Sequence, residues 1–363
     1  MPRRNSRSWM YRRGRAARAC RAGAGTRSGR AASHKEEDVV MRSIVIVTAV
    51  AVAALAESAE KTRPKDGAGG PRQSAVERLG WQIGIQTYSF NRFTLFEAIE
   101  KAKAAGVKFI EAYPGQKIAK DVEGSMGPGM APEAIEKVKA KLKECDITLV
   151  AFGVTGLGSE AEARTTFDFA RTMGIKVITS EPDPKDMAML DKLCGEYNLK
   201  VGIHNHPKPS RYWNPDTVLE AVKGCSDRIG ACADTGHWAR SDLDPLECMK
   251  KLSGRIVSMH MKDLNQKGGG AHDVVWGTGV CNIPAIMEEM LKQSFKGPIS
   301  VEYEHNWDNS LPEITQSIAF FTQKARELVR AQRGQRGGNE RPDAGKRSGD
   351  AGRRSGDAGK KSQ

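Results

Sequence analysis

Short apolar runs alternate with longer amphipathic segments from residue 81 onward. Eight such runs recur, and each is followed by a segment in which apolar residues have helical spacing. Eight strand–helix units within roughly 250 residues are typical of a closed (β/α)8 barrel. The runs are IGIQTYSF (83–90), KFIEAYP (108–114), TLVAFGV (148–154), KVITSEP (176–182), KVGIHNHP (200–207), RIGACADTGH (228–237), IVSMHMKD (256–263) and PISVEYE (298–304).

The segments between these runs predict the outer helices of the barrel. The first of them ends on Gly106, a residue type that commonly terminates helices. An open, doubly wound sheet is the structural alternative, but it usually has a glycine-rich turn after its first strand, where this chain has SFNRFT. We therefore predict an α/β fold, a (β/α)8 TIM barrel over residues 81–330. The predicted helices cover residues 93–106, 132–145, 162–174, 185–197, 214–224, 244–252, 283–293 and 312–329.

The two ends of the chain have a different character from the predicted barrel. Residues 1–40 are rich in Arg, Ala and Gly without apolar periodicity, which predicts disorder. Residues 41–58 have the layout of a secretory signal peptide, with an uncleaved membrane anchor as the alternative, and residues 59–80 form a polar linker. Residues 331–363 repeat KRSGDAG as RRSGDAG and predict a second disordered, basic tail.

The position of the signal-like segment bears on localisation. Signals normally lie at the N-terminus, so one explanation is that translation starts at Met41 and that residues 1–40 are a misassigned extension. A used signal predicts export, with cleavage near Ala56. Without it, the protein would be cytoplasmic or membrane-anchored.

The formal charge of +13 is located at the ends of the chain. Residues 1–40 carry a net +8 and residues 331–363 a net +5, whereas residues 41–330 hold 37 basic and 37 acidic side chains. A neutral body lacks the broad basic face that follows a phosphate backbone, so we expect no nucleic-acid partner. The tails could make a weak contact with an anionic surface.

Residues with acid–base and metal-binding chemistry stand at the ends of most predicted strands. In a closed barrel every strand C-terminus opens onto one mouth, so residues far apart in sequence would form a single mixed His/carboxylate cluster. We expect Glu302 to be the deeper and Glu304 the rim residue of the last strand. The strand-end candidates are Glu111, Glu181, His204, His206, Asp234, His237, His260, Lys262, Glu302 and Glu304.

The chemistry of this cluster predicts one bound divalent ion. Imidazole and oxygen ligands without thiolates suit Mn²⁺, Mg²⁺, Co²⁺ or Zn²⁺. Such an ion can polarise a carbonyl while a nearby carboxylate or imidazole moves a proton. Lys262 could hold a substrate oxygen or stabilise negative charge. The structural alternatives are that Asp234 only caps a helix and that His204 and His206 only bind neighbouring loops.

The chain resembles the sugar phosphate isomerase/epimerase proteins with a xylose-isomerase-like barrel. The resemblance implies metal ligands at Asp234, His260 and Glu302, and substrate contacts from His237, Lys262 and the 272–279 loop with Trp276. It is carried by IEAYPGQ (110–116), GIHNHP (202–207), ACADTGHWARSDLDP (231–245), SMHMKD (258–263), DVVWGTG (273–279) and ISVEYE (299–304).

One departure from that family concerns the fourth ligand. Well-studied ketose epimerases carry a metal-binding Glu at the end of strand five, where this chain has His204-Asn205-His206. Either His204 replaces that carboxylate or Glu181 supplies it from strand four. The two-carboxylate proton shuttle of the epimerases is therefore in question, which leaves room for isomerase, dehydratase or sugar-lyase chemistry.

The sequence favours a metal-dependent isomerase or epimerase acting on a sugar or keto-sugar through an enediolate. Glu302, Lys262 and Glu181 are the expected catalytic residues, and Glu111, His204, His206, His237, Trp276 and Glu304 the expected substrate contacts. An apurinic-site endonuclease on a related barrel would need more zinc ligands than the seven histidines of this chain readily supply. A non-catalytic, sugar-binding barrel is the other alternative, and no oligomeric state is predicted.

Overall fold

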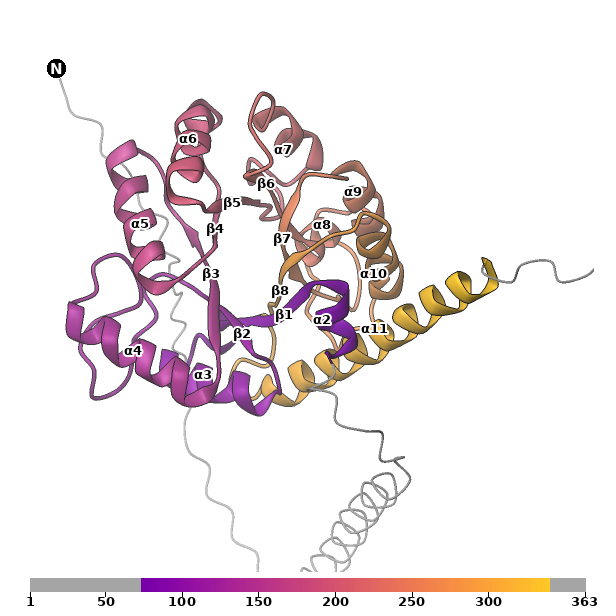
Figure 1. Ribbon diagram of the computed structural model, residues 1–363, viewed down its shortest axis with the longest axis horizontal. Helices are drawn as coiled ribbons and strands as arrows, with labels where there is room; N and C mark the ends of the chain where they lie inside the picture. Colours follow the sequence, from indigo (N-terminus) through magenta and orange to yellow (C-terminus); the bar gives the residue numbers. More distant parts are fainter. Residues whose placement is uncertain (1–72, 340–363) are drawn as a thin grey trace, which may run out of the picture. The chain divides into compact units, whose positions relative to one another are not determined.

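The computed structural model describes residues 73–339, and they form a closed eight-stranded barrel (Figure 1). All neighbouring strands are parallel, and β1 closes the barrel by pairing with β8. The TIM barrel predicted from the sequence is confirmed. The strands are β1 Trp81–Gln86, β2 Phe109–Ala112, β3 Thr148–Thr155, β4 Val177–Ser180, β5 Lys200–His204, β6 Ile229–Asp234, β7 Ile256–Met261 and β8 Gly297–Val301.

Helices surround the strands and present their apolar faces to them. Each predicted helix is present, and all but the last lie within a few residues of their expected ends. Gly106, just past α3, adopts a left-handed backbone (φ +81°), as its predicted role at the helix end requires. The helices are α2 Ala75–Leu79, η1 Thr87–Phe90, α3 Leu95–Ala104, α4 Pro132–Cys145, α5 Glu160–Met173, η2 Pro184–Asp186, α6 Met187–Tyr197, α7 Pro215–Ala221, α8 Thr235–Arg240, α9 Pro245–Lys251, α10 Ile283–Lys292 and α11 Leu311–Asn339.

Strand register brings the functional ends of the last strands to one level. Asp234 of β6 lies opposite His260 of β7, which in turn lies opposite Ser300 of β8. The strand interiors are fully buried because helices cover the outside and side chains fill the inside of such a barrel. The residues at the mouth are therefore attached to tightly packed strands.

Three elements differ from the prediction. Residues 75–79, assigned to the linker, form α2, which has a capping box between Ser74 and Glu77. The run ending in Thr235-Gly236-His237 is not all strand, because β6 stops at Asp234 and α8 begins at Thr235. Helix α11 continues to Asn339, beyond the boundary placed at residue 330.

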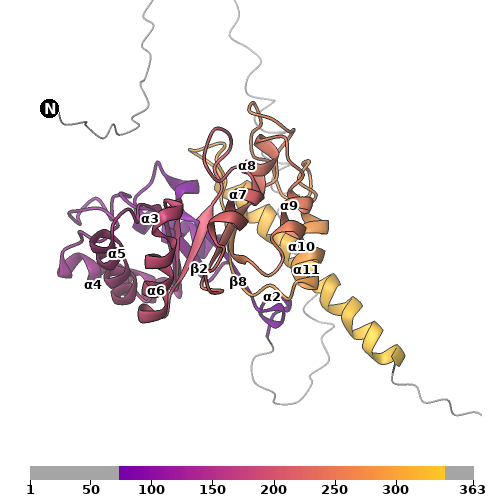
Figure 2. The same cartoon turned by 90° about the horizontal axis from the view of Figure 1, so that it is seen from above.

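Figure 2 shows α2 at the end of the barrel opposite α8. This arrangement follows from the chain, since α2 directly precedes β1 and α8 directly follows β6. The barrel therefore has a closed end near α2 and a functional end near α8.

Within residues 73–339, no helix is both long and apolar enough to cross a membrane. The expectations for residues 1–40, for the signal-like segment 41–58 and for most of the 331–363 tail fall outside the described residues.

Candidate functional site

A cavity of about 300 Å³ opens at the C-terminal ends of the strands. Four of its lining residues, His206, His237, Glu302 and Glu304, were predicted as site residues. The others were not predicted as site residues. The full lining is Gln86, Tyr88, Tyr113, Pro114, Gly153, Val154, His206, His237, Glu302 and Glu304.

Four side chains with metal-ligand chemistry meet beside this cavity, and one of them, Glu302, lines it. They come from the ends of four consecutive strands, β5 to β8, and each offers one ligand atom within 4.8 Å of the others. All four are buried. The structure thus brings together the predicted ligands Asp234, His260 and Glu302. Of the two candidates for the fourth ligand, His204 belongs to this group and Glu181 does not. The set is His204, Asp234, His260 and Glu302.

Asp234 has two roles, one for each carboxylate oxygen. The backbone N–H of His237 donates to Oδ1 at 2.7 Å, which caps α8. Oδ2 is buried without a hydrogen-bond partner and faces the cluster. The side chain of Asn205 fixes the backbone of Asp234 by donating to its carbonyl (2.9 Å) and accepting from its N–H (2.8 Å). Helix capping and ligand presentation are therefore compatible in this residue.

His260 is held from both sides of its ring. Nε2 lies 2.9 Å from Glu111 and Nδ1 lies 3.1 Å from Glu302. Glu111 is fully buried and also accepts hydrogen bonds from the hydroxyls of Thr179 and Ser300, both at 2.7 Å. It does not line the cavity, and its carboxylate holds the ring of His260; the expected substrate contact from Glu111 stays a prediction.

His204 lies between two carboxylates. Nε2 is 3.5 Å from Asp234 and Nδ1 is 3.5 Å from Glu181, and neither nitrogen has a hydrogen-bond partner. Burial lowers the pKa of His204, but Asp234 and Glu181 outweigh it and raise the pKa to about 9. Both ring nitrogens are thus directed at anionic groups, the environment of a metal-ligating or proton-carrying imidazole.

Glu181 organises His206 at the cavity wall. Its carboxylate contacts Nδ1 of His206 and accepts from the His206 N–H (3.2 Å) and the Ser210 hydroxyl (3.0 Å). Glu181 does not itself line the cavity, whereas His206 does. Glu181, predicted as a catalytic residue, thus contacts the cavity residue His206 and also lies 3.5 Å from His204.

The ammonium group of Lys262 lies among three carboxylates. Nζ is 2.7 Å from Glu302, 3.0 Å from Asp234 and 3.0 Å from Glu304. The contact with Asp234 is an ion pair without hydrogen-bond geometry. Gly236 makes room for the lysine stem, since a Cβ there would lie 2.7 Å from Lys262 Cβ. Lys262 is fully buried, is absent from the cavity lining and holds three carboxylates; its expected contact with a substrate oxygen stays a prediction.

Two charged residues that the sequence analysis missed extend this network. Arg240 donates to Glu304 at 2.5 Å and to Asp273 at 2.8 Å, and its Nη1 lies 3.1 Å from His237 Nδ1. The position of Arg240 after the Asp-Thr-Gly-His motif gave a weak signal, because a one-turn helix projects its last residues back over the motif. Asp273 begins the DVVWGTG motif of the 272–279 loop, which the resemblance linked to substrate contacts, but its own charge was not singled out.

The ionisation of Glu302 and His237 follows from these contacts. Burial favours the protonated form of Glu302, but Lys262 and His260 outweigh it and hold its pKa well below the usual range. Burial, Lys262 and His204 keep the pKa of His237 well below its usual value despite Asp234. At neutral pH the cavity therefore presents a Glu302 carboxylate and a neutral His237 imidazole.

Trp276 is a packing residue. Its ring is buried, lies 5.8 Å from the ring of Phe321, and does not line the cavity. The expected substrate contact from Trp276 stays a prediction. The aromatic residues of the cavity are Tyr88 and Tyr113, whose ring centroids are 5.2 Å apart, with Trp307 5.8 Å from Tyr88.

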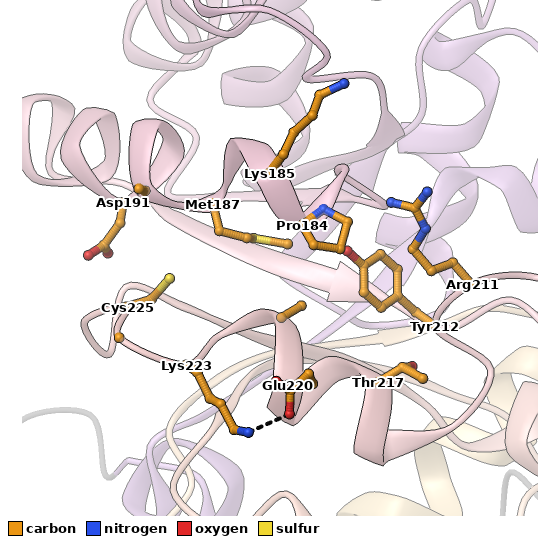
Figure 3. A pocket seen from close by; sticks show the side chains of 13 residues that line it. Pro184, Lys185, Met187, Asp191, Arg211, Tyr212, Thr217, Glu220, Lys223 and Cys225 are labelled. Carbon is orange, nitrogen blue, oxygen red and sulfur yellow. Dashed lines mark ion pairs between the residues drawn. The ribbon is translucent and has the colours of Figure 1, made fainter.

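A larger cavity of about 680 Å³ lies outside the strands, between α6 and α7 (Figure 3). Met187 and Tyr212 contribute apolar surface, and the Lys223–Glu220 ion pair (2.5 Å) lies at its edge. It contains none of the residues predicted from the sequence, and neither group of potential metal ligands found in the described residues lies there. We therefore place the functional site at the mouth of the barrel.

The four-residue cluster fits a divalent ion. Two imidazoles and two carboxylates are suitable ligands for Mn²⁺, Mg²⁺, Co²⁺ or Zn²⁺. Asp234 Oδ2 and His204 Nε2, which lie 3.5 Å apart, are buried polar atoms without hydrogen-bond partners, and a cation bound to both would satisfy them. Fold and site together define a TIM barrel with a candidate metal centre at its mouth.

Residues 99–324 match the xylose isomerase-like TIM barrel family, and the chain belongs to that family. This confirms the resemblance noted in the sequence. Among curated proteins, an inosose dehydratase from Lactiplantibacillus plantarum is 24% identical over 143 residues. That match spans 35% of this chain and about half (48%) of the relative.

Solved structures repeat the same fold. A protein from Parabacteroides distasonis is 33% identical, with a TM-score of 0.56 over 67% of this chain and 99% of its own. A D-tagatose 3-epimerase-like protein is 17% identical (TM-score 0.55, 69% and 99% covered). A xylose isomerase-like protein from Mycobacterium smegmatis, solved with magnesium, is 13% identical (TM-score 0.55, 70% and 98% covered). The last two likenesses show the fold alone.

Proposed function

We propose that this protein is a divalent-metal-dependent isomerase or epimerase that moves a proton beside the carbonyl of a sugar or keto-sugar. The observation that carries the proposal is the buried cluster of two histidines and two carboxylates on consecutive strands, beside a cavity that Glu302 lines. Membership of the xylose isomerase-like family and the epimerase-like structural neighbour support it.

His204, Asp234, His260 and Glu302 would hold the ion. Glu111 orients His260 and Glu181 approaches His204, so each ligating imidazole has a carboxylate behind it. When bound, the ion supplies a Lewis acid that polarises the substrate carbonyl and favours the enediolate.

Two proton carriers face the cavity from different strands. Glu302 follows β8, and Lys262 keeps it ionised and therefore able to accept a proton. His206 follows β5 and is oriented by Glu181, so its second ring nitrogen is free to donate or accept. Neutral His237 can hold a substrate hydroxyl. Removal of a proton by one of these groups and its return by the other from a different side would invert the carbon beside the carbonyl, as an epimerase does.

A dehydratase or sugar lyase is the second candidate. The relative from Lactiplantibacillus plantarum is an inosose dehydratase, and loss of water beside a carbonyl passes through the same kind of enolate. The specific observation in its favour is His206, which could protonate a leaving hydroxyl where the ketose epimerases expected from the resemblance have a carboxylate-based shuttle. Only the product distinguishes the two reactions.

The test is turnover in D₂O by the metal-stripped full chain, reloaded in turn with Mn²⁺, Mg²⁺, Co²⁺ and Zn²⁺. We expect activity on a panel of keto-sugars and cyclic keto-polyols to return with at least one ion. Deuterium should appear at the carbon beside the carbonyl, as NMR would show. Product formation with neither solvent exchange nor a primary isotope effect at that carbon would contradict the enediolate route.

Variants separate the roles within this test. Glu302→Gln should lower turnover by about 10²-fold or more, the usual loss for a proton-transfer group. Lys262→Met should lower turnover much more than metal affinity, whereas Asp234→Ala should lower both. Glu133→Gln, a matched change of an exposed carboxylate on α4, should leave both unchanged.

A further inference from the structure

We infer that the cavity selects uncharged polyhydroxy carbonyl compounds and rejects their phosphorylated and carboxylated counterparts. This inference rests on the proposed function and names the substrate class of the same site. It follows from the charges at the cavity and from where the neighbouring backbone N–H groups point.

The cavity wall has no Arg or Lys side chain. Among the lining residues, all of them within the described part of the chain, the carboxylates are Glu302 and Glu304 and the imidazoles are His206 and His237. Recognition of a phosphate or carboxylate normally uses Arg or Lys in direct contact with the anion. An anionic substituent placed in this cavity would find no Arg or Lys on the wall and would lie beside two carboxylates whose cations are already paired with them.

The two basic side chains nearest the cavity are already neutralised. Lys262 pairs with Asp234, Glu302 and Glu304. Arg240 pairs with Glu304 at 2.5 Å and with Asp273 at 2.8 Å. An anion could recruit either cation only by displacing a buried carboxylate, which leaves that carboxylate unpaired and is strongly unfavourable.

Backbone N–H groups are the other means of binding an anion, and those of the loop after β7 are already used. TIM barrels frequently bind phosphate with the loops after the last two strands. Here Asp263 accepts the N–H groups of Gly277, Gly279 and Cys281, each at 2.9 Å, and of Leu264 at 3.1 Å. The glycine-rich loop after β7 therefore directs its N–H groups to an internal carboxylate.

The remaining wall suits a neutral sugar ring. Tyr88 and Tyr113 line it, and edge-to-face contacts with Tyr113 and Trp307 fix the ring of Tyr88. Such aromatic surface can cover the C–H face of a sugar. Burial raises the pKa of Tyr113 to about 12, so its phenol stays protonated and can donate to a hydroxyl. Gln86 and His237 add neutral polar groups.

The experiment compares matched ligands on the metal-loaded full chain by calorimetry. The neutral set is D-fructose, D-tagatose, D-glucose and a cyclic keto-polyol, and the anionic set is fructose 6-phosphate, tagatose 6-phosphate and glucuronate. We expect at least one neutral ligand to bind about tenfold or more tightly than its charged counterpart, a difference of about 1.4 kcal/mol. Equal or tighter binding of the charged members, or no binding by the whole neutral set, would overturn the inference.

This readout separates the inference from the proposed reaction. Neutral ligands that bind without turnover would count against the reaction and support the selectivity. Turnover of a phosphorylated member with a better kcat/KM than its neutral counterpart would support the reaction and reject the selectivity.

The variant Glu304→Gln tests whether the paired carboxylates cause the rejection of anionic ligands. The change removes one carboxylate from Lys262 and Arg240 and leaves a similar shape, so fructose 6-phosphate should bind about fivefold or more tightly than to the wild type. Glu133→Gln on α4 should not change that affinity. An unchanged phosphate affinity in Glu304→Gln would show that the paired cations do not set the selectivity.

Discussion

Asp273 shows, at the scale of one residue, how burial and ion pairing oppose each other. Its side chain is buried, with Oδ2 paired to Arg240 at 2.8 Å and Oδ1 without a hydrogen-bond partner. Burial raises the pKa of Asp273 more than Lys262 and Arg240 lower it, to about 7. In an unfolded chain the pKa of an aspartate side chain is about 3.9. Between these two pKa values the folded protein holds a proton that the unfolded chain releases.

The consequence is a specific pH dependence of stability. Because the folded-state pKa of Asp273 is the higher one, this residue makes the protein less stable as the pH rises from about 4 to 7. In Asp273→Asn that loss disappears. The variant should therefore gain about 2 kcal/mol relative to the wild type between pH 5 and pH 8, as measured by urea unfolding. The exposed control Asp227→Asn should show no such trend. If the difference in free energy of unfolding between Asp273→Asn and the wild type did not change with pH, Asp273 would be ionised throughout this range.

Individual site residues were predictable where strand ends determine them. His204, Asp234, His260 and Glu302 follow from the rule that parallel strands end at one mouth. The deep burial of Glu111 could not be predicted, because a sequence pattern does not show which strand ends before the others along the barrel axis. Arg240 and Asp273 were missed for a different reason: a helix and a loop bring them back over the mouth after the strand has ended.

At the scale of elements, the loop after β7 is organised around one side chain. Both carboxylate oxygens of Asp263 are used: Oδ1 accepts from Leu264 and Cys281, and Oδ2 accepts from Gly277 and Gly279. Gly279 must be small, since a Cβ there would lie 2.4 Å from Asp263 Oδ1. The loop carries Asp273, so its order supports the charge network of Arg240.

Asp263→Asn should disrupt this loop although it changes only one polar atom. An amide can replace only one carboxylate oxygen as an acceptor, so its NH₂ group would face two backbone N–H donors. We expect a loss of about 2–4 kcal/mol in the free energy of unfolding, together with faster hydrogen exchange in residues 264–281. Gly279→Ala should perturb the same amides, while the exposed control Asp121→Asn should not. Unchanged exchange in Asp263→Asn would contradict this role.

The boundary between β6 and α8 shows where pattern analysis of elements reaches its limit. Apolar periodicity ran through Asp-Thr-Gly-His, so the segment was predicted to continue as strand. The capping ability of Asp234 was recognised only as an alternative to metal binding, yet one oxygen caps α8 while the other faces the cluster. A residue with two acceptor atoms can satisfy a local and a long-range role together, and local patterns reveal only the first.

At the scale of the whole molecule, strand–helix alternation was sufficient to predict the barrel, because each unit is a local pattern and closure follows from their number. It was not sufficient to find α2, whose composition resembles the preceding polar linker. Helix α2 packs against α11 and β1, the elements at the two ends of the described chain. Val76 is buried there, and Trp81, next to the helix, donates from its indole to the Phe295 carbonyl at 3.2 Å and contacts Phe321.

Helix α2 should therefore stabilise the barrel by covering its closed end. We predict that a chain starting at Trp81 is less stable than one starting at Gln73 by about 2 kcal/mol, the value of burying one Val side chain and part of a Leu. For a domain of this size that corresponds to a Tm lower by about 4 °C or more. Val76→Ala in the full chain should reproduce part of the loss, whereas Arg78→Ala, on the exposed side of α2, should have little effect. Equal Tm values for the two truncated chains would show that the barrel is closed without α2 and that the helix is only an extension of the linker.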